Sequence, residues 1–127
     1  MAKKVIYWIT TVLIAAAGIT AGFIYLSGAQ QAVEGFARVS YPQQLRILLG
    51  VAKPLGAIAL LIPGRPRLKE WAYAGFTFAW IAALPAHYLV HETSSAVTAL
   101  VLLVILIVSY FTRPESRRVP APAAAYV

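Results

Sequence analysis

Two ionisable side chains of this 127-residue sequence stand inside apolar segments, where a charge is costly. Lys53 and Pro54 interrupt the apolar run 49–61, LGVAKPLGAIALL. His87 lies in another apolar run, at 71–90. Pro54 has no backbone N–H, so the carbonyl of Gly50 is free for another partner. A buried amino group is suited to bind the polar head of a quinone or another lipophilic molecule, or to stabilise an anionic intermediate. The structural alternative is that it satisfies the freed carbonyl or lies in a hydrated crevice.

The second apolar run places aromatic residues and a histidine on one helical face. Tyr73, Trp80 and His87 follow one another at intervals of seven. If both runs are ideal helices that cross a membrane, His87 lies about 7–8 Å nearer than Lys53 to the outer, non-cytoplasmic end of its helix. A lysine side chain can bridge that gap directly or through water. The pair would suit a carbonyl ligand or proton exchange, whereas the alternative is a histidine bonded to a serine, a tyrosine or a backbone carbonyl. The candidate ligand-binding residues are Lys53, His87, Trp80, Tyr25 and Tyr73, and Lys53 and His87 are the candidates for a catalytic acid or base.

The sequence contains few residues that could support other kinds of site, such as a metal site or a catalytic triad. His87 and His91 in HYLVHE share a helical face, but the stretch is not HExxH, and Glu92 and the distant Glu34 are the only further ligands in view. We therefore predict no metal site. Cysteine is absent and there are four acids in all, which leaves no thiolate site and no paired carboxylates. No Ser/His/Asp set and no phosphate-binding glycine loop is present in the sequence.

The composition indicates a protein that is solvated by lipid. Hydrophobic residues make up 61% of the chain and charged residues only 12%, a surplus too large for one core of this size to bury. The net charge of +7, from 11 basic and 4 acidic residues, lies mostly at the ends of the apolar segments. This placement is typical of membrane topology, so we expect the lipid bilayer as a partner and no nucleic acid.

The elements that must position these residues are four apolar runs, at about 5–26, 45–62, 71–90 and 95–112. Each is long enough, or nearly so, to cross a hydrocarbon layer of about 30 Å as a helix. The sequence predicts an all-α fold, an integral membrane antiparallel four-helix bundle, with one four-span domain over 1–112. The segment 113–127 is rich in proline and alanine, and we expect it to be a disordered cytoplasmic tail.

The basic residues predict the orientation of the spans. Eight of them flank one side of the runs, whereas Arg38 and Arg46 lie on the other. The positive-inside rule then places both termini and the link 63–70 in the cytoplasm. The first run could also belong to a signal peptide, but it continues well past the alanines that would form the cleavage site. The eight residues are Lys3, Lys4, Arg65, Arg67, Lys69, Arg113, Arg117 and Arg118.

Small residues indicate where the helices approach one another. Gly18 and Gly22 lie four apart in the first run, and Gly50 and Gly56 flatten the second. Faces of this kind allow close approach of helix backbones in a membrane. Within the link between these runs, helical spacing of apolar residues over 29–37 predicts a short helix at the membrane surface.

The stretch LGVAKPLGAIALLIPGRPRLKEWAYAG, the later His87 and the closing SYFTRP resemble the DoxX-like family of small four-span membrane proteins. The resemblance covers residues 14–114, and LKEWAYAG at 68–75 is its most specific part. It implies a multi-pass protein of the bacterial inner membrane. Relatives include the small subunit of a thiosulfate:quinone oxidoreductase, a partner of oxidative-stress proteins, and chaperones of ligand-gated channels.

Two positions depart from the pattern of that family. Members commonly carry a lysine late in the first span, where this chain has Tyr25, and many carry an acid in the third span, where this chain has Ala79. The joint absence of a buried base and a buried acid fits the loss of an ion pair, because a lone partner would be costly. Because of this departure, the function of a polar site in relatives is a weaker guide to the function of this chain.

Three functions follow as hypotheses. The first is an accessory or ligand-binding subunit that holds a quinone or another lipophilic molecule and serves a redox or stress-response assembly. The second is a membrane enzyme that uses Lys53 or His87 as acid or base on a lipophilic small molecule. The third is a structural partner or chaperone of another membrane protein. A quinone is the cofactor that the first hypothesis implies.

Overall fold

The structure is a computed structural model that describes residues 1–120, and these residues form helices and short links without any strand. The all-α prediction is therefore confirmed for this part of the chain. Four long helices cover the four apolar runs, and a shorter helix follows the first of them. In chain order they are α1 (Ala2–Leu26), α2 (Gln30–Arg38), α3 (Gln43–Leu61), α4 (Pro66–Leu89), α5 (Thr93–Phe111) and the 3-10 helix η1 (Glu115–Arg117).

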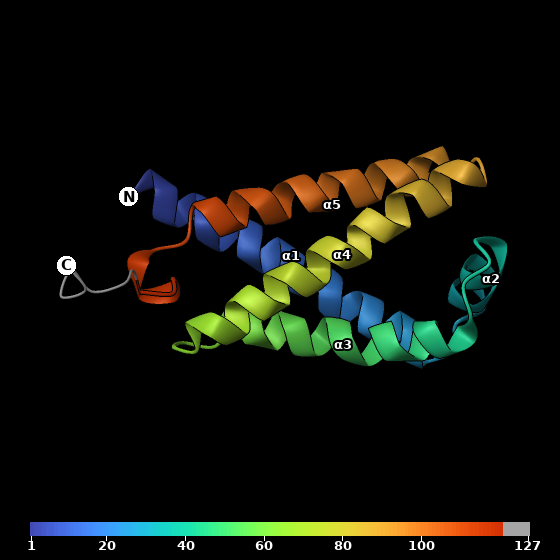
Figure 1. Cartoon of the computed structure of the whole chain (residues 1–127), viewed down its shortest axis with the longest axis horizontal. Coiled ribbons are helices and arrows are strands. Elements are labelled where there is room, and N and C mark those ends of the chain that lie inside the picture. Colours follow the sequence, from blue (N-terminus) through green and yellow to red (C-terminus); the bar gives the residue numbers. More distant parts are fainter. Residues whose placement is uncertain (121–127) are drawn as a thin grey trace, which may run out of the picture.

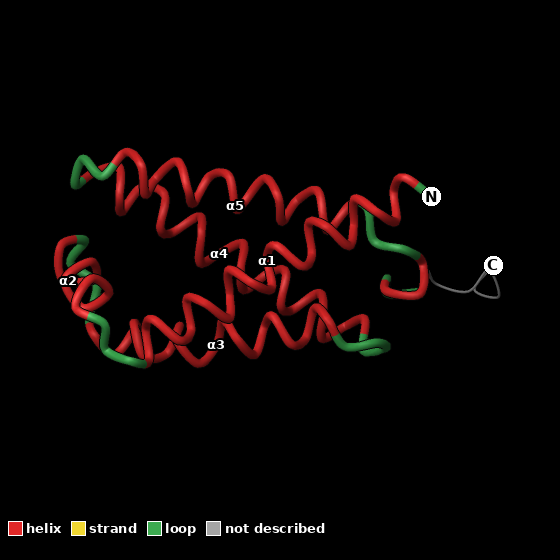
Figure 2. Tube along the Cα trace, turned by 180° about the vertical axis from the view of Figure 1, so that it is seen from behind, coloured by secondary structure: helices red, strands yellow, loops and turns green. Residues whose placement is uncertain are grey.

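The four long helices lie side by side, and α2 closes one end of the assembly (Figures 1 and 2). The helix α1 packs most extensively on α3 and also contacts α5, whereas α4 packs on α5 and, less extensively, on α3. Met1 and η1 lie at the opposite end from α2 (Figure 1). We call these two ends the α2 end and the terminal end.

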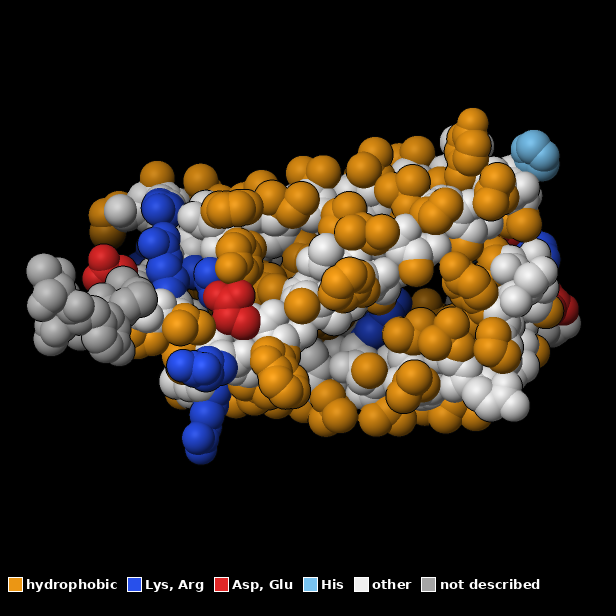
Figure 3. Space-filling view, in the orientation of Figure 1, with side chains coloured by type: hydrophobic (Ala, Val, Ile, Leu, Met, Phe, Trp, Pro, Cys, Tyr) orange, Lys and Arg blue, Asp and Glu red, His pale blue; other side chains and the backbone are white. Residues whose placement is uncertain are grey.

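Three helices within residues 1–120 are long and apolar enough to cross a membrane: α1, α3 and α5. The helix α4, which covers the expected third span, is not among them. It is long enough, but it begins with Arg67, Lys69 and Glu70 and carries several polar side chains further along. Large apolar side chains such as Phe23, Leu48 and Phe78 are mostly exposed. They cover much of the visible surface, as lipid contact would require (Figure 3).

Close contact between α1 and α3 depends on small residues, as the glycine pattern predicts. A Cβ atom on Gly22 would lie 2.0 Å from the Cγ of Pro54 and 2.9 Å from the carbonyl oxygen of Gly50. A Cβ atom on Gly18 would lie 3.1 Å from the carbonyl oxygen of Lys53. The proline ring in α3 therefore sits against the glycine face of α1, which sets the distance between the two helices.

The core contains a polar chain of three hydroxyl groups. The hydroxyl of Ser109 lies 2.7 Å from that of Thr11 and 2.8 Å from that of Tyr73. Ser109 and Thr11 are fully buried. Because each group has a partner, the network links α1, α4 and α5 without an unsatisfied donor. The apolar core around it consists of Ile14, Leu60, Tyr73, Phe76, Trp80, Ala99 and Leu106.

Two basic residues bind carbonyls in the last turn of α3 and in the link that follows it, at the terminal end. The fully buried Lys69 donates to the carbonyls of Ala59, Ile62 and Gly64. Arg117 donates to the carbonyls of Leu60 at 2.9 Å and Leu61 at 3.2 Å. The C-terminal carbonyls of a helix carry partial negative charge, so these cations cap α3.

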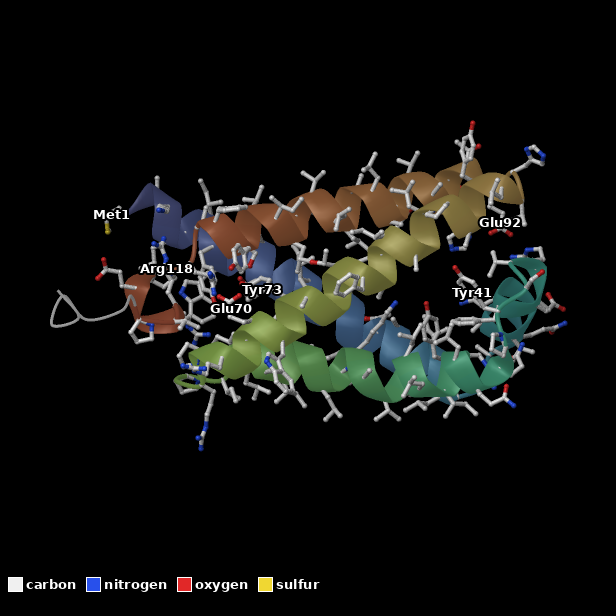
Figure 4. The ribbon with its side chains drawn as sticks, viewed as in Figure 1. Met1, Tyr41, Glu70, Tyr73, Glu92 and Arg118 are labelled. Carbon is white, nitrogen blue, oxygen red and sulfur yellow. The ribbon has the colours of Figure 1, made fainter. Side chains whose placement is uncertain are left out.

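A second cluster at the terminal end ties α4 to the end of α5. Arg113 donates to the carboxylate of Glu70 at 2.8 Å, and the hydroxyl of Tyr110 donates to the same carboxylate at 3.0 Å. The side chains of Glu70 and Tyr73 lie close together in this region (Figure 4). Arg113 and Arg117 belong to the segment 113–127 that we expected to be disordered. They are buried here, and the part of that segment at 121–127 lies outside the described residues.

Candidate functional site

A cavity of about 1070 Å³ lies at the α2 end. Residues from all five α-helices line it, together with the links that follow α2 and α4. The cavity depends on small side chains along α4, because a larger residue at these positions would fill the space. These residues are Gly75, Ala79, Ala82, Ala83 and Ala86.

Lys53 contributes its amino group to the wall of this cavity. The residue is 9% exposed, and it stands at the middle of α3 next to the proline that packs on α1. Its Nζ lies 3.5 Å from the hydroxyl of Tyr25 and 4.9 Å from the centroid of the tyrosine ring. Among the described residues the hydroxyl is the only hydrogen-bond partner of Nζ, and the structure records no bond from it to a freed carbonyl. The amino group therefore has donor capacity left for a ligand.

His87 lines the same cavity nearer the α2 end, but its partner is a carboxylate. The Nδ1 atom lies 2.7 Å from Glu92, whose other oxygen accepts a hydrogen bond from Arg38. The pKa of Glu92 is lowered, first by the hydrogen bond to His87 and then by the hydrogen bond from Arg38. The rim thus holds a compact set of three polar groups, with the carboxylate of Glu92 between the imidazole of His87 and the guanidinium of Arg38.

The helix α2 covers the α2 end of the cavity. Its Phe36 is buried with its ring 5.2 Å from that of Tyr25, edge to face. After α2, the hydroxyl of Tyr41 donates to the carbonyl of Ala82 at 3.1 Å. Figure 4 shows Tyr41 and Glu92 near each other at the α2 end. Together with the ion pair between Arg38 and Glu92, these contacts fasten α2 across the helix ends.

The structure separates the five predicted site residues into two groups. Tyr25, Lys53 and His87 line the cavity, whereas Tyr73 and Trp80 do not. Trp80 stacks on Phe76 in the core with ring centroids 5.1 Å apart. Residues seven apart drift by only about 20° on a straight helix, so the spacing leaves their depth along the helix undecided. Tyr73 and Trp80 lie in the core, whereas His87 lies near the C-terminal end of α4. Lys53 and His87 share the cavity without a hydrogen bond between them in the described structure.

Three groups of the site were not predicted as ligand-binding residues: Arg38, Tyr41 and Glu92. Arg38 and Glu92 are 54 positions apart, so no local spacing could reveal their contact. The only sequence signal for the His87–Glu92 contact was that Glu92 follows His87 by five residues, in the link between α4 and α5. Residues 1–120 contain no group of three His, Cys, Asp or Glu side chains placed to hold a metal ion.

Comparison with known proteins gives one match. A family model described as the DoxX-like family matches residues 9–109, which include α2, α3 and α4 and most of α1 and α5. No curated protein and no solved structure matches the chain significantly.

Proposed function

The chain belongs to the DoxX-like family, and on that premise we propose that it is a ligand-binding membrane subunit for a quinone or a similar lipophilic molecule. The resemblance found in the sequence is confirmed by the family match. We place the chain in the bacterial inner membrane with four spans, α4 included, and with both termini in the cytoplasm. The basic residues at the terminal end support this orientation.

The observation that carries the proposal is the position of Lys53. The residue is 9% exposed, lines a cavity of about 1070 Å³ and has one long hydrogen bond to a tyrosine. A buried amino group without an anionic partner is costly, and a carbonyl or anionic oxygen on a ligand would offset that cost. A quinone offers carbonyl acceptors on an apolar body, which matches this lining.

Binding is tested by extracting small molecules from the purified protein and identifying them by mass spectrometry. We expect a quinone or another lipophilic oxygen acceptor from the wild type and its loss from Lys53→Met. Lys4→Met is the matched control, because it removes an amino group from an exposed position. Finding no bound molecule in the wild type, or equal amounts in both variants, would refute the proposal.

The His87–Glu92 pair supports a second candidate function. A carboxylate that orients Nδ1 leaves the other ring nitrogen to exchange a proton with a ligand in the cavity. The chain would then act as an enzyme on a lipophilic small molecule. Turnover whose pH profile moves on His87→Gln would support catalysis, and binding that is unchanged by the same substitution without any turnover would exclude it.

We also propose that the chain works as an accessory subunit of a redox or stress-response assembly. Its described residues offer a cavity and a carboxylate–imidazole pair. In this role a bound quinone would exchange electrons with a partner protein. Purification with a redox protein, and loss of that partner's quinone-dependent activity when this chain is deleted, would test the role.

A further inference from the structure

The cavity has a groove beside it, between α3 and α4. A groove of about 420 Å³ runs along these two helices, and four residues line both spaces. Lys53 and Gly75 are two of them, and Leu49 and Ala79 are the others. In the space-filling view a basic side chain is visible in a hollow among apolar ones (Figure 3). The groove and the cavity therefore share part of their lining, which includes Lys53, and we call this shared lining the junction.

The groove is bordered by side chains that face outward. Leu48, Leu55 and Trp71 line it, and each is more than half exposed, at 62%, 61% and 78%. Within the described lining Lys53 is the only charged residue. The helices α3 and α4 also pack less extensively on each other than α1 packs on α3. This side of the molecule thus presents an apolar groove with one amino group in its lining.

Gly75 is one of the residues that line both spaces. A Cβ atom built on this glycine would meet no other atom within 4 Å, unlike one on Gly22 or Gly50. Close helix packing therefore does not explain the absence of a side chain at this position. A larger side chain at this position would take up space beside the lining that the groove and the cavity share.

We propose that this groove is the tail-binding part of the site and its entrance from the bilayer. The ligand is then a long-tailed amphiphile of the isoprenoid-quinone class, with its oxygen-bearing head at Lys53 and its tail along α3 and α4. The rim at the α2 end carries Arg38 and Glu92, which an apolar tail would avoid. This inference rests on the proposed function, to which it adds the class of ligand and the route of entry.

The test compares two probes on the full chain in lipid nanodiscs: a quinone with a long isoprenoid tail and the same quinone head without a tail. Gly75→Phe fills the junction, and Ala52→Trp fills only the groove, because Ala52 lines the groove but not the cavity. Ile81→Trp is the control, since Ile81 is exposed on α4 and lines neither space. We expect the first two variants to lose at least tenfold in affinity for the tailed quinone.

Binding of the tailless quinone shows whether each variant is folded with an intact head site. We expect Ala52→Trp to keep this affinity within twofold and Ile81→Trp to leave both affinities unchanged. Equal binding of the tailed quinone by the wild type and Ala52→Trp would overturn the inference. So would a cross-link from position 52 to another membrane protein that occupies the groove. If the wild type binds neither quinone, the proposed function itself is refuted. If Ala52→Trp loses binding of the tailed quinone but keeps binding of the tailless one, the result supports the groove as the tail-binding site.

Discussion

The amino group of Lys53 in α3 lies 3.5 Å from the hydroxyl of Tyr25 in α1, with the tyrosine ring also within 4.9 Å. A neutral hydroxyl at this distance is a weak partner for a buried amino group. The contact orients the lysine toward the cavity without neutralising it. The arrangement fits a residue that is kept for a ligand better than one that is kept for stability.

Lys53→Met should therefore leave the protein as stable as the wild type or more stable. Methionine has a similar volume and removes the cost of burying an amino group, so we expect the free energy of unfolding to stay level or rise by about 1–2 kcal/mol. Reversible unfolding in bicelles measures this quantity. A decrease of more than about 2 kcal/mol would indicate a structural role for the amino group instead.

Tyr25→Phe provides a matched test of the same contact. It removes the hydroxyl but keeps the ring, and we expect a cost of about 1 kcal/mol in the wild-type background. In the Lys53→Met background the cost should disappear, because the partner is already absent. The double-mutant cycle gives the coupling energy directly, and additive effects would show that the two side chains do not interact.

Gly22→Ala should destabilise the contact between α1 and α3. The added methyl group would lie 2.0 Å from the Cγ of Pro54, so the helices must separate at a cost of about 1–3 kcal/mol. Gly75→Ala is the control, because its methyl group meets no atom and should stabilise α4 slightly. Adding Pro54→Ala to the Gly22 variant should restore part of the loss. Equal stability of the two glycine variants would contradict this account.

Arg117→Ala should expose the last turn of α3. The guanidinium binds the carbonyls of Leu60 and Leu61, and its loss leaves buried acceptors at a cost of about 1–3 kcal/mol. We expect faster hydrogen exchange over residues 58–64 and a lower free energy of unfolding. Arg67→Ala should change neither quantity, because Arg67 is an exposed cation of the same end. An Arg117 variant that behaves like the Arg67 variant would refute the capping role.

Acid should release α2 from the turn between α4 and α5. The pKa of Glu92 is lowered by its hydrogen bonds to His87 and from Arg38, so folding favours the ionised carboxylate. The stabilisation is fully present above the ordinary value of 4.5 and is lost as the pH falls through the lowered pKa. Spin labels on α2 and the turn should show separation in this range. Glu92→Gln should abolish the transition, whereas Glu34→Gln, which alters only an exposed contact within α2, should not.

The contacts of single residues show how far sequence reasoning reaches. The lengths of the apolar runs and the spacing of Gly18 and Gly22 depend on local periodicity, which is why α1 and α3 and their glycine face were predictable. The partner of His87 was not predictable in this way, because Glu92 is brought to His87 only by the turn that follows α4. Tyr73 and Trp80 were predicted to join the site, but the seven-residue spacing does not say whether their face meets the cavity or the core.

The sequence by itself determined that the chain is all-α, apolar over four runs, and a member of its family, and that an amino group lies within one of those runs. These properties follow from composition and from neighbours along the chain. The tertiary structure decided which helices meet, that Lys53 and Tyr25 share a cavity with His87, and that Arg117 caps α3. Such contacts join positions far apart in the chain, and only the packing of whole helices brings them within bonding distance.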